Sequence, residues 1–585
     1  MKSQCLIPIV LIMLISLFSY INIFDNEFVW DDHIFILENQ DIRSFSNIML
    51  FFSEDFDGLY RPLRSLHYTV VYSIAGKNEF LYHFNAFFFH TAISILIFLI
   101  ILKLVENRNI AMVSAFIFAA HPIHTARVTN MTAGFDLLGI FFMLSSFYCY
   151  IKHSKENVKG CFFVSLFLFL LAVFASEEAI TLPLIIILYE FTFNKETFIK
   201  KLKNDIIAKY LGYFLIALLY IAVRILIIGF RGRVEEYLAG NFFFTMLTML
   251  KVYVNYIWLL IFPVNLTLFH EVSPVKGIFD LKMILSFLVL IIIFVVWIKN
   301  HKNKIMFFSI SWFFVTLIPF SNIAPIQVFM AERYLYVPSI GFSLLLSHGL
   351  FSVYKIKSRI SQKLVKGAII AIIILLLGFY IAKTIDRNND WQDNLTLWSK
   401  TVLTNPNNSR AHDNLGFTYD HMRQDEKALE EFEKAVYLQQ DNFRALANLG
   451  IAYAKVNRYN DSLIMLQKSI DIRPYHKTYD KIGLVYSKLG QDEKAIGQFE
   501  KAIGLEPRYA KAHNDLASAY ASIGKFDLAL QSFNDATRID PDYADAHYNL
   551  GILLEFLGQD ELAQKEFQIA FELEPKNSLY RKKIR

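Results

Sequence analysis

The chain changes character near residue 384. Before that point long apolar stretches alternate with short polar connections, and after it the sequence is charged and repetitive. Over all 585 residues, 55% are hydrophobic and 16% aromatic, which is too apolar for an ordinary soluble protein. The net charge of only +5 gives no indication of a nucleic-acid partner. We therefore predict an all-α protein with two domains, a polytopic membrane bundle over residues 1–384 and a helical-repeat domain over 385–585.

The first domain contains eleven apolar stretches that are candidate membrane-spanning helices. They are residues 6–24, 84–104, 109–120, 134–151, 161–175, 178–193, 206–229, 281–299, 305–320, 334–353 and 365–383. A further apolar stretch, residues 242–262, carries Lys251 and precedes Pro263, so it either spans the membrane or lies in the interface. The first stretch is expected to be an uncleaved span, because Tyr20–Phe24 offers no cleavage site of small residues.

Basic residues gather in five short connections, which favours one orientation in the membrane. The connections are residues 103–108, 152–159, 195–203, 300–304 and 355–366. The positive-inside rule places all five in the cytoplasm, and this is possible only if residues 242–262 do not cross. We therefore predict eleven spans, a cytoplasmic N-terminus, and the second domain on the outer side of the membrane.

The second domain repeats with a period close to 34 residues. Its recurring segments are Asn414-Leu415-Gly416, Asn448-Leu449-Gly450, Ile482-Gly483, Asp515-Leu516-Ala517 and Asn549-Leu550-Gly551, and prolines close units at Pro406, Pro474, Pro507, Pro541 and Pro575. Two helices per unit, with small residues where they cross, are typical of the tetratricopeptide repeat (TPR). The pattern predicts an α-solenoid of a half unit and about five repeats.

Asn414, Asn448, Asn514 and Asn549 are predicted to occupy equivalent positions in the first helix of their repeats. In one interpretation they line a peptide-binding groove, where side-chain amides would hold an acceptor backbone. In the other they form hydrogen bonds between repeats. The sequence favours neither interpretation.

Asp31 and Asp32 are adjacent carboxylates just after the first predicted span. At that depth they would face the membrane surface, where a lipid-linked substrate presents its head group. The simpler alternative is that one of them caps a short helix.

Other polar groups are expected on the same outer face, and five of them are candidate substrate-binding residues. These are Arg61, His121, Asp136, Glu178 and Arg333. Ionisable groups at the ends of spans are costly unless paired or hydrated, so each is a functional candidate. An arginine there can also extend to lipid phosphate. His121 and His124 are predicted to be packing residues, since no set of metal ligands is evident.

These stretches together resemble the transmembrane and tetratricopeptide-repeat protein O-mannosyltransferases and, more broadly, the GT-C type of glycosyltransferase. The resemblance covers the whole chain and rests on the order of its motifs: Trp30-Asp31-Asp32, Tyr60-Arg61-Pro62-Leu63, His83-Phe84-Asn85 with His90, His121-Pro122-Ile123-His124, Asp136-Leu137-Leu138, Glu178–Pro183 and Ala331–Ser339. Three positions depart from the family pattern: Ala126 replaces an acidic residue, Phe135 an arginine, and Glu177 a lysine.

The resemblance implies transfer of a sugar, mannose in this family, from a polyprenyl-phosphate carrier to Ser or Thr hydroxyls of exported proteins. Asp31 or Asp32 would accept the proton of the alcohol. Arg333, followed by Arg61, would bind the leaving phosphate, while Glu178 and His121 would shape the sugar site. The repeats would recruit the acceptor protein. No cofactor is assigned, although a divalent cation is possible.

Two alternatives stay open. The chain could be a non-catalytic membrane scaffold that assembles envelope proteins on its repeats. It could instead be a glycosyltransferase that acts on a lipid or polysaccharide. The outer side would be the periplasm or exterior in a prokaryote and the lumen of the endoplasmic reticulum in a eukaryote.

Overall fold

The computed structural model describes residues 2–194, 206–229, 237, 239–326, 328–353 and 361–584. These residues form helices and connections without a β-strand, apart from one isolated bridge between Phe56 and Leu59. The chain divides into two compact units, Met1–Leu397 and Trp398–Arg585, which we call the membrane unit and the arm. The prediction of an all-α chain is confirmed.

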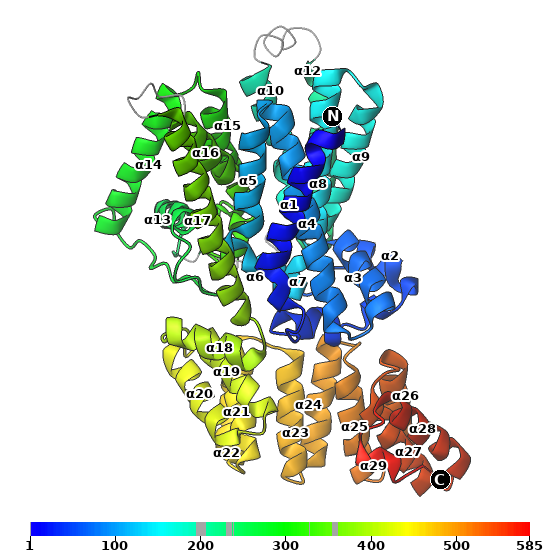
Figure 1. Cartoon of the computed structure of the whole chain (residues 1–585). Coiled ribbons are helices and arrows are strands. Elements are labelled where there is room, and N and C mark those ends of the chain that lie inside the picture. Colours follow the sequence, from blue (N-terminus) through cyan, green and yellow to red (C-terminus); the bar gives the residue numbers. More distant parts are fainter. Residues whose placement is uncertain are drawn as a thin grey trace. The chain divides into compact units, whose positions relative to one another are not determined.

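The eleven stretches predicted to span the membrane are all helical in the membrane unit (Figure 1). The helices are α1 (Lys2–Tyr20), α4 (Glu79–Val105), α5 (Arg108–Ala120), α8 (Leu137–Glu156), α9 (Lys159–Ala175), α10 (Leu182–Phe193), α12 (Ile206–Ile228), α14 (Leu281–Lys299), α15 (Lys304–Thr316), α16 (Pro338–Val353) and α17 (Gln362–Asn389). Seven helices of the described residues are long and apolar enough to cross a membrane by themselves. The number of spans stays a prediction.

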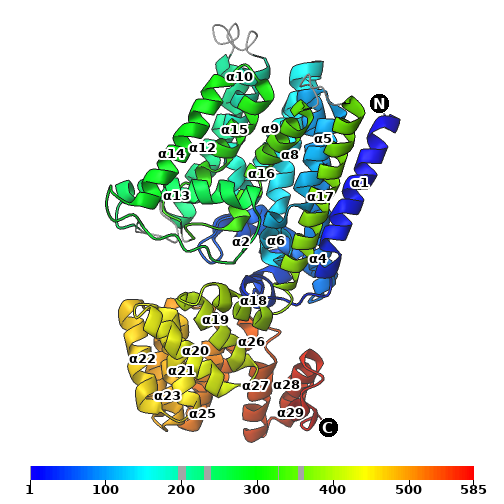
Figure 2. The ribbon, with the colours of Figure 1, turned by 60° about the vertical axis from the view of Figure 1, so that its left-hand side comes forward.

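The stretch 242–262 forms α13 (Phe242–Ile261). This helix is one of the seven whose length and composition would allow them to span the membrane. Figure 1 views this helix nearly end-on, whereas α5 and α17 run along the bundle, and Figure 2 shows the same crossing from another side. That direction is the one expected of a helix lying in the interface.

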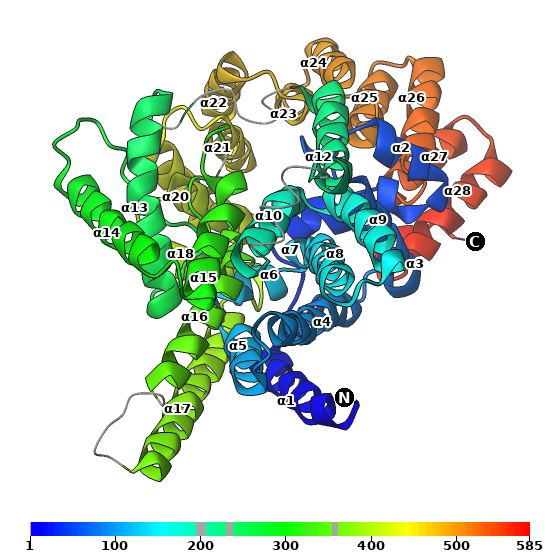
Figure 3. The ribbon, with the colours of Figure 1, turned by 90° about the horizontal axis from the view of Figure 1, so that it is seen from above.

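Helices α1, α4 and α5 pack against one another, and α17 packs on α1 and α5 (Figure 3). Their shared core contains fully buried apolar side chains such as Ile12, Ile93 and Phe118. In contrast, α14 and α17 keep large apolar side chains such as Phe294 and Leu375 exposed. Exposed apolar surface of this extent marks contact with lipid rather than with water.

Three of the five basic connections, 103–108, 152–159 and 300–304, adjoin one end of the membrane unit. Lys155 Nζ lies 2.8 Å from Glu106 Oε1 and also donates to the backbone oxygen of Lys103. Asn194, at the end of α10, donates to the hydroxyl of Ser154, and Lys304 donates to the oxygen of Phe193. The predicted connection 195–203 and half of 355–366 lie outside the described residues.

Shorter elements occur mainly in the connections at the opposite end. They include α2 (Ile48–Ser53), α3 (Pro62–Ala75), η5 (Pro122–His124), α6 (Thr125–Val128), α7 (Met131–Gly134), η6 (Glu177–Thr181) and η8 (Glu332–Leu335). Two prolines mark the start of helices at this end. Proline is favoured at the first position of a helix because its φ angle is fixed near the helical value. Pro62 starts α3 and Pro122 starts η5.

The arm consists of antiparallel helix pairs. They are α19 (Ser409–His421) with α20 (Asp425–Leu438), α21 (Phe443–Lys455) with α22 (Tyr459–Ile472), α23 (His476–Lys488) with α24 (Asp492–Leu505), α25 (Ala510–Ser522) with α26 (Phe526–Ile539), and α27 (Ala544–Phe556) with α28 (Asp560–Leu573), followed by α29 (Ser578–Arg581). They are preceded by α18 (Asn394–Thr404), which starts in the membrane unit. The arm therefore contains five helix pairs in the described residues, with one helix before them.

Candidate functional site

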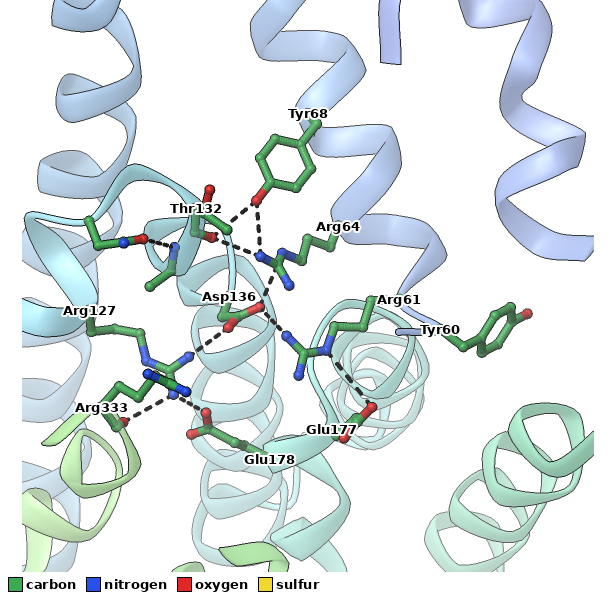
Figure 4. Close-up of polar contacts among 12 residues, drawn as sticks. Tyr60, Arg61, Arg64, Tyr68, Arg127, Thr132, Asp136, Glu177, Glu178 and Arg333 are labelled. Atoms are coloured by element: carbon green, nitrogen blue, oxygen red, sulfur yellow. Dashed lines mark hydrogen bonds and ion pairs between the residues drawn. The ribbon is translucent and has the colours of Figure 1, made fainter. Parts of the chain in front are cut away.

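Three arginines surround one carboxylate at the end of the membrane unit opposite the basic connections (Figure 4). Asp136 immediately precedes α8. Its Oδ1 lies 2.9 Å from Arg61 Nη1 and 3.3 Å from Arg64 Nε, and its Oδ2 lies 2.7 Å from Arg127 Nη1. Asp136 and Arg127 are both buried, and charges removed from water are stable only when paired and hydrogen-bonded. These contacts make Asp136 the centre of a charged cluster.

Arg127 connects this centre to a second carboxylate. Its other terminal nitrogen, Nη2, forms an ion pair with Glu178 Oε1 and donates to the backbone oxygen of Arg333 at 3.1 Å. Burial raises the pKa of Glu178, although Arg127 opposes the shift. The second oxygen of Glu178, Oε2, is buried without a hydrogen-bond partner among the described residues.

Glu177 completes the set of acidic groups. Its Oε1 lies 3.9 Å from Arg61 Nε and 3.7 Å from Arg224 Nε of α12. Burial by itself would lower the pKa of Arg61, but Asp136 and Glu177 more than offset it and raise that pKa. The guanidinium is therefore charged at any physiological pH.

Arg333 is the least committed cation of the cluster. Its guanidinium lies 5.2 Å from the centre of the Tyr334 ring, and it forms no ion pair with any residue that the structure describes. It is nevertheless close enough to Asp136 to influence that carboxylate. The charged cluster, which we define as Arg61, Arg64, Arg127, Asp136, Glu177, Glu178, Arg224 and Arg333, thus holds five cations and three anions and has an excess of two positive charges.

Asp32 is fully buried and fixed by the backbone. Its Oδ2 accepts from the backbone N–H of Val29 at 3.0 Å, and its Oδ1 accepts from that of Thr132 at 2.7 Å. Burial raises the pKa of Asp32 to about 6, while these hydrogen bonds oppose the shift. With both oxygens used, Asp32 holds the loop together, whereas Asp31 beside it is only half-buried.

The loop carrying Asp31 and Asp32 is hydrogen-bonded to the charged cluster through Thr132. The backbone oxygen of Thr132 accepts from Arg64 Nη2 at 3.0 Å and from the Tyr68 hydroxyl at 3.2 Å (Figure 4). The N–H of Thr132 donates to Asp32. The structure therefore brings Asp32, Arg61, Asp136, Glu178 and Arg333 into one connected region, with Asp31 adjoining it.

His121 is placed elsewhere. Its ring is buried, lies within hydrogen-bonding distance of the backbone oxygen of Leu260 through Nε2 at 3.0 Å, and packs 4.6 Å from the Tyr380 ring. Within the described residues, none of its contacts is with the charged cluster. This is the environment of a packing residue, and in the described part of the chain no three His, Cys, Asp or Glu side chains are grouped so as to hold a metal ion.

The departures from the family pattern have identifiable surroundings. Phe135 is fully buried with its ring 3.8 Å from that of Tyr68 and 4.7 Å from that of His67, so an aromatic cluster occupies this place. Ala126 is buried within α6. Glu177 stands where the family pattern has a lysine, and it forms an ion pair with Arg224. Arg224 therefore brings a positive charge to the place where that lysine is missing.

The four candidate groove asparagines do not all share one position. The helix starts at Ser409, Phe443, Ala510 and Ala544 place Asp515, rather than Asn514, opposite Asn414, Asn448 and Asn549. The predicted equivalence of Asn514 is thus wrong by one residue, because Asn514 lies 35 residues before Asn549 whereas the repeat between them is 34 residues long. In the third repeat the position is occupied by Lys481.

Most side-chain hydrogen bonds of these asparagines connect neighbouring repeats. Asn448 donates to Asp413 at 2.9 Å and accepts from Lys481 Nζ at 2.7 Å, and Asn549 donates to Asn514 at 3.0 Å. Asn414 donates within its own helix to the oxygen of Arg410. The contacts correspond to the second of the two interpretations offered by the sequence.

Three cations of the cluster, Arg64, Arg127 and Arg224, are missing from the candidates chosen from the sequence. Arg127 follows the His-Pro motif within a short outer connection, where any arginine is a candidate. Arg224 is an ionisable residue inside an apolar helix, and such residues signal function by themselves. Their partners, Glu178 and Glu177, are distant in the sequence, so only the fold shows the pairs.

Membrane-length helices, a charged cluster at one end of the bundle, and an arm of helix pairs define a class, the polytopic membrane proteins with a helical-repeat domain. Tetratricopeptide-repeat models match residues 409–442, 444–473 and 544–577, and a related model, described as TPR repeat, matches 483–524 and 517–558. The arm is therefore a TPR domain.

Similarity to characterised proteins extends beyond the repeats. The chain is 27% identical over 454 residues to protein O-mannosyl-transferase TMTC3 of Mus musculus, an alignment that covers 70% of this chain and 49% of the relative. It is 24% identical over 441 residues to protein O-mannosyl-transferase F38B6.6 of Caenorhabditis elegans, covering 71% and 60%. The chain spans about half the length of the curated relatives it matches first. The resemblance to the transmembrane and TPR protein O-mannosyltransferases is thereby confirmed.

Two solved structures of TPR proteins are similar to about a third of the chain. The TPR protein YrrB is 24% identical, with 32% of this chain and 96% of that chain covered and a TM-score of 0.25. A TPR protein of Thermus thermophilus is 24% identical, with 30% and 95% covered and a TM-score of 0.28.

Proposed function

We propose that this chain is a membrane glycosyltransferase that moves a sugar, mannose by analogy with its named relatives, from a polyprenyl-phosphate carrier to Ser or Thr hydroxyls of exported proteins. The observation that supports it most is the net charge of the charged cluster. Five arginines and three carboxylates give the cluster itself an excess of two positive charges, and the carboxylates of Asp31 and Asp32 lie in the adjoining loop.

The excess charge matches the leaving group of such a transfer. A polyprenyl-phosphate sugar carries one negative charge on its phosphodiester, and the polyprenyl phosphate that departs carries up to two. A site with two surplus cations is complementary to the product charge and to the transition state in which that charge develops. Arg333 is the arginine best placed to bind it, because it forms no ion pair within the described residues.

The reaction also needs a base. As the alcohol oxygen bonds to the anomeric carbon, the bond between that carbon and the phosphate oxygen breaks, and the alcohol proton passes to a carboxylate. Asp32 is occupied by two backbone N–H groups, so we assign the proton transfer to Asp31. One displacement of this kind inverts the anomeric centre.

The remaining residues have supporting roles in this proposal. Asp136 and Glu178 hold Arg61, Arg64 and Arg127 in place rather than contacting the sugar. The TPR arm recruits the acceptor on the outer side of the membrane, which is the periplasm or the endoplasmic reticulum lumen according to the cell. The basic connections at the far end of the membrane unit favour this orientation.

The test compares exported proteins by mass spectrometry from cells expressing the wild type, Asp31→Asn or Arg333→Gln. Asp386→Asn is a matched control, because Asp386 is exposed and, among the described residues, forms an ion pair with Lys383 alone. We expect hexose on Ser and Thr peptides to disappear with Asp31→Asn and to fall at least about 100-fold with Arg333→Gln, at unchanged protein level.

Other results would replace the proposal. Unchanged protein glycans in both variants, together with a defect on deletion of residues 386–585, would support the membrane scaffold. A change confined to glycolipids or polysaccharides would show that the enzyme acts on a different acceptor.

A further inference from the structure

The loop that contains Asp31 is held by one side chain far away in the sequence. Asn394, the first residue of α18, accepts from the backbone N–H of Trp30 through Oδ1 at 3.0 Å. Its Nδ2 lies 3.1 Å from Nε2 of His33, at the correct distance for a hydrogen bond. Trp30 precedes Asp31 by one residue and His33 follows Asp32 by one. A single amide therefore binds both residues that flank the carboxylate pair.

The backbone at Trp30 needs such support. Its φ of 53° lies in the left-handed region, which is unfavourable for a residue with a side chain. Unfavourable conformations of this kind persist only where surrounding contacts impose them. Asn394 supplies a contact at Trp30 itself, and Asp32 anchors the other side of the turn on Thr132.

Asn394 is itself held in a rigid setting. Asp393 accepts from the N–H of Thr396 at 2.7 Å and so fixes the start of α18. Immediately before it, Trp391 is 1% exposed, and the oxygen of Gln392 accepts from the N–H of Glu27 at 2.9 Å. Asn388 makes three further side-chain bonds, to Ser19, Asn22 and Thr129. The segment 388–394 is thus a firm support for the loop.

We propose that Asn394 is a positioning residue for Asp31, which fixes the carboxylate where it meets the acceptor hydroxyl. This inference rests on the proposed transferase function. Asn394 does not contact the reacting atoms; it acts through the backbone of Trp30 and the ring of His33. Catalytic geometry is sensitive to displacements of about 1 Å, which cost on the order of 100-fold in rate.

The test uses the purified full chain and three variants. Asn394→Leu is similar in size to Asn394 and removes both hydrogen bonds. Asn394→Asp keeps an acceptor for Trp30, and His33 can donate from Nε2 to the second oxygen, so it is the conservative variant. Asn389→Leu is the control from the same segment, because Asn389 accepts from the Asn22 side chain and, in the described part of the chain, makes no bond to residues 27–36.

The first readout is hydrogen–deuterium exchange of peptides covering residues 27–36. We expect faster exchange there in Asn394→Leu, and wild-type exchange in Asn394→Asp and Asn389→Leu. The second readout is transfer of labelled mannose from polyprenyl-phosphate mannose to exported proteins extracted from cells without the chain. Asn394→Leu should lower kcat at least about tenfold with KM for the donor within about twofold, and Asn394→Asp should restore most of the rate.

Unchanged exchange in Asn394→Leu, or an equal loss of kcat in Asn389→Leu, would overturn the positioning role. A rise in KM with kcat unchanged would overturn it as well. A wild-type protein without transfer activity would instead overturn the proposed function, and the exchange data would separate that outcome from the first.

Discussion

Arg127 shows at the level of a single residue how buried charges can be structural and functional at once. It is 2% exposed and contacts Asp136, Glu178 and the backbone oxygen of Arg333. These three partners lie on three different elements. Its contribution is therefore to organise the charged cluster, and Arg333 is left to bind a substrate phosphate.

Replacing Arg127 by leucine should destabilise the membrane unit, because Glu178 would be left buried without its cation. Removing one partner of a buried pair costs about 3–5 kcal/mol. We expect a clear fall in the thermal midpoint of the detergent-purified chain, measured by fluorescence-detected size exclusion. Arg333→Gln is the control and should keep the midpoint, since Arg333 forms no ion pair among the described residues. Equal midpoints for both variants would contradict this assignment.

Asp515 in the arm gives a prediction that depends on pH. Burial and the nearby Asp480 raise the pKa of Asp515 above its usual value. Ionising Asp515 is therefore more costly in the folded state than in the unfolded chain. The penalty is complete above the raised pKa, shrinks as the pH falls through it, and vanishes below the pKa of the unfolded chain.

Asp515→Asn removes this penalty. In the compact unit 398–585, we expect it to increase the free energy of unfolding at both pH 8 and pH 5, with a gain at least about 1 kcal/mol larger at pH 8. Urea unfolding at both pH values measures the difference, with the exposed Asp527→Asn as control. A gain that is the same at both pH values would mean that the charge of Asp515 is not responsible.

Helix pairs in the arm depend on small residues where the two helices cross. A Cβ added to Gly483 in α23 would come within 2.5 Å of Phe499 Cε1 in α24, and Phe499 is 1% exposed. A Cβ added to Gly497, also in α24, would meet no atom of the described residues within 4 Å. The two glycines therefore have opposite consequences for packing within one repeat.

We expect Gly483→Ala to destabilise the arm by about 1–3 kcal/mol through overpacking. Gly497→Ala should stabilise it by about 0.5–1 kcal/mol, because alanine favours the helix and meets no neighbour. Urea unfolding of both variants, followed by circular dichroism, measures the two effects. A neutral Gly483→Ala would show that Phe499 moves aside at little cost.

At the scale of the whole molecule, charge and fold agree on the orientation of the membrane unit. The basic connections around Lys103, Lys155, Asn194 and Lys304 adjoin one end, while the charged cluster lies at the other. The positive-inside rule then predicts that the end with the basic connections faces the cytoplasm.

Cysteine labelling tests this orientation in intact cells or sealed vesicles. After Cys5, Cys149 and Cys161 are replaced by serine, a cysteine is introduced at exposed Asp441 or at Lys155. We expect a membrane-impermeant maleimide applied from the outer side to label position 441 and to leave position 155 unlabelled until the membrane is opened. Labelling of position 155 from outside would reverse the topology, and with it the proposed site of glycosylation.

Local patterns determined much of the fold in advance. Apolar runs of spanning length and a 34-residue period are properties of neighbouring residues, so the eleven helices and the TPR pairs could be predicted from them. The register of single residues is less evident from the sequence: the second repeat is one residue shorter, and Asn514 lies one residue before the position that Asn549 occupies in its own repeat. Arg61, Asp136, Glu178 and Arg333 were recognised as candidates because polar residues at the ends of spans are rare.

Tertiary structure decided which of those groups meet. Only the fold shows that Arg127 bridges Asp136 and Glu178, that Arg224 pairs with Glu177, and that His121 packs on Tyr380 away from them. It also shows that the two oxygens of Asp32 accept from backbone N–H groups, which the sequence does not reveal for either member of the Asp31-Asp32 pair. The physical reason is the same in each case: periodic burial is encoded locally, whereas the pairing of buried charges depends on contacts between residues far apart in the chain.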